Sequence, residues 1–120
     1  MSAYQRTKGH AFEREIARAH TEITGHPHKR VLSETRDGNS GDVRGKVSLA
    51  VEMVTQCKVG KRPNVKLAVE QAMAARTDCS DLAVGVTRWD RDITIAAVEW
   101  EDWTAILDLI ARAAKAGVYL

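Results

Sequence analysis

Three side chains able to act together on a phosphate surround an apolar run in the middle of the chain. Asp42 precedes this run, and Gln56 and Lys58 end it. Residues two apart in a strand point to the same face, so Gln56 and Lys58 share a face. A carboxylate and an amide oxygen can hold a hard divalent cation, while a lysine stabilises charge on a phosphate or polarises a water. If Asp42 pairs beside the end of the strand, the three residues form a site suited to phosphodiester cleavage.

Other residues extend this arrangement into a longer ordered pattern. The pattern has a Lys-Gly-x-x-x-Glu at the start of a first helix, a Ser on a first strand, an Asp, and a Glu-x-Lys on a central strand. It reads here as Lys8-Gly9-His10-Ala11-Phe12-Glu13, Ser33, Asp42 and Gln56-Cys57-Lys58. In this order the chain resembles the PD-(D/E)XK nuclease superfamily, and within it the archaeal and phage Holliday-junction resolvases. The resemblance covers residues 6–88.

This resemblance implies a metal-dependent DNA endonuclease that uses Mg²⁺, or Mn²⁺ in its place, and resolves four-way junctions. Asp42 and Gln56 would be metal ligands, and Glu13 would join them directly or through a water. Lys58 would orient the attacking water and stabilise charge on the phosphate. Gln71, on a later helix, is a further candidate to support the metal site, although it also fits a solvated helix flank.

One departure from the pattern leaves two alternatives open. Gln56 stands where most members have Glu, although a Gln-x-Lys variant occurs in Mrr-type restriction endonucleases. The change removes a negative charge from the metal site, and Glu52 lies four residues away, roughly 13 Å at strand rise. One alternative is a restriction or repair nuclease acting on duplex DNA. The other, which follows from the Gln56 change, is a nuclease-derived DNA-binding protein that has lost cleavage.

The distribution of charge favours a nucleic-acid partner on the side of the motif. Residues 1–66 contain 13 Lys and Arg against 7 Asp and Glu, whereas residues 67–120 contain 5 against 9. A phosphate backbone would be drawn to the basic half in a salt-dependent way. The expected DNA-binding residues are Arg6, Lys8, Ser33, Arg36, Lys61 and Arg62.

The elements that must position these residues follow from apolar periodicity and from Gly, Pro and Asn signals. They predict an α/β domain with a central mixed five-stranded sheet flanked by helices, and the resemblance implies a restriction-endonuclease-like fold. A turn is expected at residues 44–46. The predicted helices are 8–24, 64–76 and 101–117, and the predicted strands are 29–34, 42–43, 49–58, 82–87 and 93–100.

The length and composition predict one domain over residues 1–120, with residues 1–8 as a flexible basic arm. No apolar stretch approaches the ~20 residues that cross a bilayer, and the polar start does not resemble a signal peptide. We therefore expect an intracellular protein of a prokaryotic cytoplasm, with no membrane partner. The apolar stripe of the last helix fits a core face. Because the resolvases act as homodimers on branched DNA, part of it, with Trp100 or Trp103, also fits a subunit interface.

Overall fold

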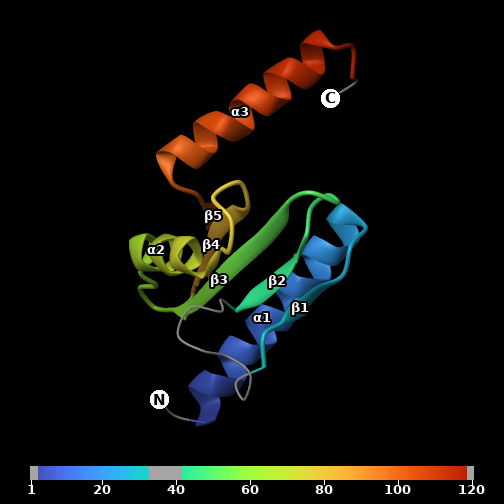
Figure 1. Cartoon of the computed structure of the whole chain (residues 1–120). Coiled ribbons are helices and arrows are strands. Elements are labelled where there is room, and N and C mark those ends of the chain that lie inside the picture. Colours follow the sequence, from blue (N-terminus) through green and yellow to red (C-terminus); the bar gives the residue numbers. More distant parts are fainter. Residues whose placement is uncertain (1–2, 33–41, 119–120) are drawn as a thin grey trace.

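A computed structural model of the chain describes residues 3–32 and 42–118. Five strands form one sheet in the order β1-β2-β3-β4-β5. Three helices accompany the sheet (Figure 1), so the predicted α/β class and mixed five-stranded sheet flanked by helices are confirmed. The elements are α1 (Ala3–Thr24), β1 (His28–Arg30), β2 (Val43–Lys46), β3 (Glu52–Gly60), α2 (Val65–Ala75), β4 (Leu82–Trp89), β5 (Thr94–Ala97) and α3 (Trp100–Lys115).

The sheet combines an antiparallel meander with one parallel crossover. β1, β2 and β3 pair antiparallel, with Val43 of β2 opposite Thr55 of β3. α2 then carries the chain over the sheet, so that β4 runs parallel to β3, and β5 returns antiparallel to β4. Because β3 is the central strand, its carboxyl end lies between neighbours on both sides. Asp42, the residue before β2, lies beside the carboxyl end of β3.

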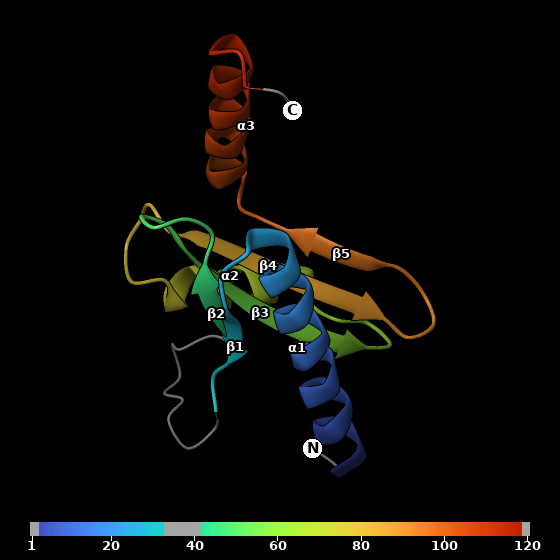
Figure 2. The same cartoon turned by 90° about the vertical axis from the view of Figure 1, so that its right-hand side faces the viewer.

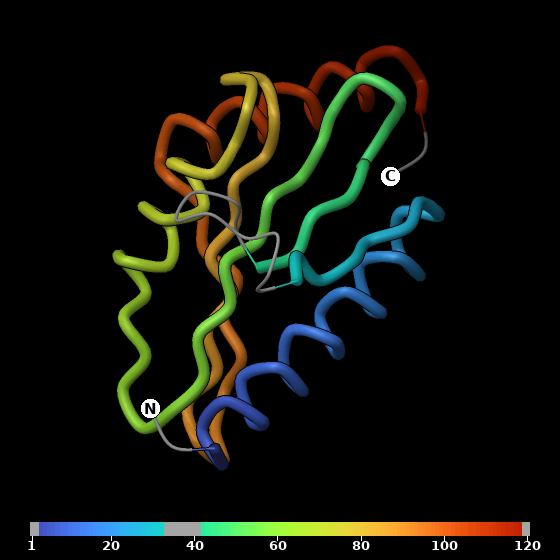
Figure 3. The backbone as a smooth tube through the Cα atoms, turned by 60° about the horizontal axis from the view of Figure 1, so that its bottom comes forward, coloured from blue at the N-terminus to red at the C-terminus, as the bar shows by residue number. Residues whose placement is uncertain are grey.

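Helices cover both faces of the sheet. On one face, Phe12 and Ile16 of α1 pack with Val86 of β4. On the other face, α2 lies so close to β4 that a Cβ at Gly85 would come within 2.8 Å of the backbone nitrogen of Val69. Figure 3 shows the strands between the two helices. β3, which carries Gln56 and Lys58, therefore has a helix on each of its faces.

A set of ionic contacts joins the first half of α1 to β4 and the turn after it. The guanidinium of Arg88 donates to both oxygens of Glu15, at 2.9 and 2.5 Å, and lies 4.7 Å from the centroid of the Phe12 ring. The hydrogen bond from Arg88 lowers the pKa of Glu15 below its ordinary value. Lys8 forms an ion pair with Asp90 in the turn. These contacts fix the start of α1 over the carboxyl ends of β3 and β4.

The first helix begins earlier than predicted. α1 starts at Ala3, so residues 3–8 are helical and the predicted flexible arm is wrong for them. Thr7 Oγ1 donates to the carbonyl of Ala3 at 2.9 Å, and Lys8 reaches Asp90 from the second turn. Apolar periodicity gave no sign of this extension, because polar contacts rather than a buried face support it.

The turn between β2 and β3 also lies later than predicted. Residues 44–46 belong to β2, and the chain turns at residues 47–50, where Ser48 Oγ accepts from the backbone N–H groups of Ala50 and Val51. Gly45 had indicated a turn. It is needed in the strand instead, because a Cβ there would lie 2.4 Å from the ring of His28.

The last helix departs most from a core role. No residue of α3 is buried, and Trp100 is 71% exposed, so its apolar stripe is not part of the core of the chain. The helix starts at Trp100, before the predicted start, because the Glu99 carboxylate accepts from the N–H groups of Glu101 and Asp102. None of the described helices is both long and apolar enough to cross a membrane.

Candidate active site

Asp42 is held at the junction of three strands. Its N–H donates to the carbonyl of Thr55 at 3.1 Å, and its own carbonyl accepts from Val31 at 2.9 Å. Its carboxylate accepts from the N–H of Cys57 at 2.8 Å, and the residue is only 5% exposed. Because Val43 pairs with Thr55, Asp42 lies beside Gln56 in the antiparallel register. The predicted pairing of Asp42 with the end of the strand is therefore present.

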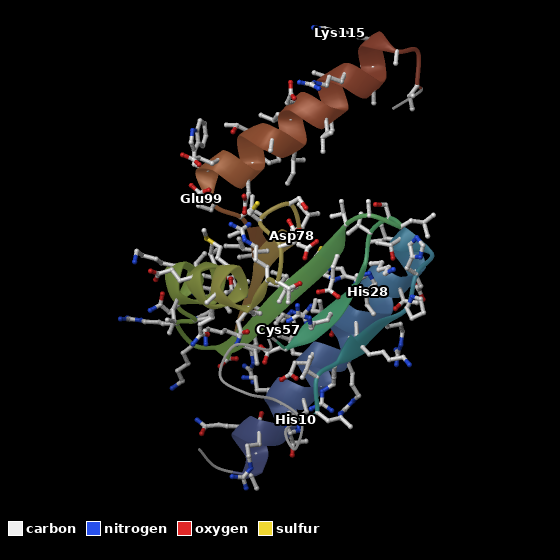
Figure 4. The ribbon with its side chains drawn as sticks, in the orientation of Figure 1. His10, His28, Cys57, Asp78, Glu99 and Lys115 are labelled. Carbon is white, nitrogen blue, oxygen red and sulfur yellow. The ribbon has the colours of Figure 1, made fainter. Side chains whose placement is uncertain are left out.

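The four predicted catalytic residues line one cavity of about 700 Å³. Glu13 belongs to α1, Asp42 directly precedes β2, and Gln56 and Lys58 lie near the end of β3. On β3 they occupy the strand face opposite to Cys57, which packs toward α1. Figure 4 labels His10 on α1 and Cys57 on β3, the two elements that face each other across the cavity. The full lining is Gln5, Arg6, Gly9, His10, Phe12, Glu13, Asp42, Gln56, Cys57, Lys58, Val59 and Pro63.

Glu13 is buried at the cavity wall and is held by a cation. Its Oε1 accepts from Nε of Arg30 at 3.2 Å, and the residue is 7% exposed. A buried carboxylate on an apolar helix face is stabilised by such a partner. Because Arg30 already engages Glu13, the arrangement suits a Glu13 that acts through a bound water better than one that binds a metal directly.

Lys58 is a cation at the cavity lining. It shares its strand face with Gln56, is partly exposed at the cavity, and forms no ion pair with another described residue. Glu52, at the other end of β3, accepts from Arg44 at 2.7 Å and is absent from the cavity lining. Glu52 therefore does not replace the missing carboxylate at Gln56.

The predicted DNA-binding residues divide into three groups. Arg6 lines the cavity, and Lys61 and Arg62 are exposed next to Pro63, which also lines it. Lys8 is engaged by Asp90 outside the lining. Ser33 and Arg36 lie outside the described residues.

Gln71 is not among the residues that line the cavity. Its Oε1 is buried, with no hydrogen-bond partner among the described residues. The amide oxygen could accept from a water or a ligand that reaches it, but its predicted support of the metal site stays a prediction.

His10 and Arg30 are among the residues at the site that were missed in the sequence. His10 lines the cavity one turn before Glu13, and its spacing of three on the same helix face could have indicated it. Arg30 was not expected to meet Glu13, because the two lie 17 residues apart and in different elements. No sequence signal links them.

The donor set fits a hard cation that keeps part of its own water shell. Within residues 3–32 and 42–118, no three His, Cys, Asp or Glu side chains cluster closely enough to hold a metal ion. The cavity offers the Asp42 carboxylate and the Gln56 amide, with Glu13 nearby. Mg²⁺ commonly binds through one or two carboxylates and retains several waters, so this sparse oxygen set fits it.

Comparisons with protein families, with curated proteins and with solved structures give no match to this chain.

Proposed function

We propose that this protein is a metal-dependent DNA endonuclease with a restriction-endonuclease-like fold, of the PD-(D/E)XK type, that resolves four-way junctions. The observation that carries the proposal is the fixed position of Asp42 beside Gln56 and Lys58 in a cavity that also holds Glu13. The sheet supports it as well, because Gln56 and Lys58 lie on the central strand, as the resemblance implies, and Asp42 directly precedes its antiparallel neighbour.

Each residue has a role that follows from its chemistry. Asp42 and Gln56 would hold Mg²⁺ through their side-chain oxygens, and Glu13 would hold a water beside the ion. When bound, the ion lowers the pKa of a coordinated water and offsets charge on the phosphate. Lys58 orients the attacking water and stabilises the negative charge that develops on the phosphate oxygens.

Free cations near the cavity support DNA as the substrate. Lys61 and Arg62 are exposed and form no ion pair within the described part of the chain. By contrast, Arg44 and Arg88 are paired with carboxylates elsewhere in the fold. Cations that remain unneutralised beside a cleft attract a polyanion, and this attraction weakens as salt rises.

The test compares labelled four-way junction, duplex and single-stranded DNA side by side, with Mg²⁺, with Mn²⁺ and with a chelator. We expect paired cuts in the junction that require the metal. Equal cutting of plain duplex would instead favour a restriction or repair nuclease.

A second candidate is a DNA-binding protein that has lost cleavage, and Gln56 in place of the usual Glu favours it. This candidate predicts DNA binding of equal strength in chelator and in Mg²⁺, with no cleavage of any substrate. Metal titration followed by a DNA-binding measurement separates the two proposals.

A further inference from the structure

The last helix carries an apolar stripe that is largely exposed: Trp103, Leu107 and Ile110 are 40%, 44% and 47% exposed. Ile106 is half-buried, at a cavity that residues 79–82 also line. α3 has 16 residues, none of them buried. Figure 2 shows α3 extending from the body as a separate rod. A continuous apolar face of this kind on a helix is typical of a surface that a partner covers.

The first half of α3 faces the body, and its start is fixed there by an ion pair. Ile106 and Leu109 line a cavity together with residues 79–82. Arg76, just after α2, donates to Asp102 at 2.9 Å in a pair that is largely shielded from solvent. The carboxylate of Glu99 caps the helix by accepting from the N–H of Glu101 at 2.9 Å. The direction of the helix is therefore fixed at its start, while the exposed part of its apolar stripe stays open to a partner.

The sizes of the stripe residues are arranged for a second copy of the same helix. At helical spacing, Trp103 lies at one end of the stripe and Ala113 and Ala114 lie at the other. Two such helices side by side in opposite directions put the indole of each over the alanines of the other. Large against small is the arrangement that packs without voids. The stripe consists of Trp103, Ile106, Leu107, Ile110, Ala113 and Ala114.

The charges of α3 favour the same orientation. Glu101 and Asp102 lie in the first turn, whereas Arg112 and Lys115 lie in the last turn. Asp102 is already paired with Arg76 and Arg112 with Asp108, so the preference comes mainly from Glu101 and Lys115. An antiparallel pair sets the acidic turn of each helix near the basic turn of the other. A parallel pair would bring like charges together and would put indole against indole.

We propose that α3 is a dimerisation helix that pairs antiparallel with α3 of a second copy, about a two-fold axis between Asp108 and Leu109. The inference goes beyond the proposed function because it holds with or without DNA cleavage. Each helix is about 24 Å long, so the contact is small for a stable interface and association is expected at micromolar concentration. Figure 4 places Glu99 and Lys115 at the opposite end of the molecule from His10, so the pairing leaves the cavity open.

Sedimentation of the full chain without DNA, from low to high micromolar concentration, tests the pairing. The wild type should pass from its monomer mass of 13.2 kDa to twice that mass. Ile110→Glu puts a charge in the middle of the stripe and should keep the protein monomeric. Ala111→Glu is the matched control, because residue 111 is exposed beside the stripe, four residues before Lys115, and association should stay within about twofold of wild type.

Two results would overturn the pairing. One is a wild type that stays monomeric throughout the concentration range. The other is a dimer that Ile110→Glu leaves intact while circular dichroism shows all three proteins equally folded, since the dimer would then use another surface.

A size exchange tests the orientation. Trp103→Ala and Ala114→Trp should each weaken the dimer about tenfold or more, the first by leaving a gap and the second by setting indole against indole. The double variant should recover much of the loss, because it again places Trp over Ala. In a parallel pair the two positions do not meet, so additive effects, or a dimer that Ala114→Trp strengthens, would rule out the antiparallel arrangement.

Discussion

The carboxylate of Asp42 accepts a hydrogen bond from the backbone N–H of Cys57, with 2.8 Å between Oδ2 and the nitrogen. Cys57 lies between Gln56 and Lys58 on β3, so this one bond ties the acidic residue to the two other residues of the motif. The bond depends on an acceptor oxygen and not on charge. A substitution that keeps an acceptor oxygen at residue 42 should therefore separate the structural role of Asp42 from its proposed role in metal binding.

Asp42→Asn should remove metal binding and cleavage while the fold stays intact. The amide oxygen can still accept from Cys57, so the free energy of unfolding should change by about 1 kcal/mol or less. Loss of the charged ligand should lower the cleavage rate by on the order of 10²-fold or more. Urea unfolding, Mn²⁺ titration and junction cleavage measure the three quantities. Full activity in this variant would remove Asp42 from the site.

Lys58→Ala should abolish cleavage and leave DNA binding nearly unchanged. Loss of charge stabilisation at the phosphate should slow cleavage by about 10²- to 10³-fold. One phosphate contact among several contributes little to affinity. Lys66→Ala is the matched control, because Lys66 is exposed on α2 and pairs with Glu70 away from the cavity. If Lys58→Ala weakened binding and cleavage equally, Lys58 would be a DNA contact rather than a catalytic residue.

The sequence predicted the centre of the site because its residues depend on short-range rules. Gln56 and Lys58 share a face by strand alternation, and Asp42 reaches them because its strand is the next one in an antiparallel meander. The partners that hold the site obey no such rule. Arg30 meets Glu13 only after the chain folds back on α1, and Lys8 meets Asp90 across 82 residues.

The helices show that apolar periodicity alone does not identify which helix face belongs to the core. Periodicity correctly gave the apolar face of α2, where Ala68 and Ala72 are buried against the sheet. The same kind of pattern in α3 lies on a helix without a buried residue, and Trp103 stays 40% exposed. An amphipathic pattern indicates which face avoids water, but not whether the chain itself or another molecule covers it.

Stability should fall as the pH drops through the range in which histidine titrates. Burial, and next the nearby His28, lower the pKa of His20 below its ordinary value. The two rings lie edge to face at 5.5 Å, and His28 Nε2 is 2.9 Å from the carbonyl of Lys46. Below a pH of about 6.5, His20 therefore binds a proton more readily in the unfolded chain than in the folded chain, and this favours unfolding.

Urea unfolding of wild type and His20→Gln at a series of pH values measures this effect. The wild type should lose stability from about pH 6.5 downward until His20 also protonates in the folded state. In His20→Gln, the free energy of unfolding should depend less on pH over this range. Equal slopes in the two proteins would show that other groups set the acid sensitivity.

Gln56→Glu is the change that decides how the site operates. If the amide oxygen of Gln56 faces the ion, a carboxylate there adds a full negative charge beside Asp42, so Mg²⁺ or Mn²⁺ should bind about tenfold or more tightly. Cleavage should then be kept or raised. Gln56→Leu, which has no oxygen, should lose both metal binding and cleavage and serves as the control.

The wild type and Gln56→Glu together separate the two proposals for this chain. Cleavage by the wild type with Mg²⁺ supports a working site with Gln56 as a neutral ligand. A silent wild type that Gln56→Glu rescues supports a nuclease that lost activity at this one position, because Asp42 and Lys58 are still in place. If both proteins leave every DNA intact and neither binds metal, the nuclease proposal fails. Only DNA binding through the exposed cations beside the cavity, Lys61 and Arg62, is then left to test.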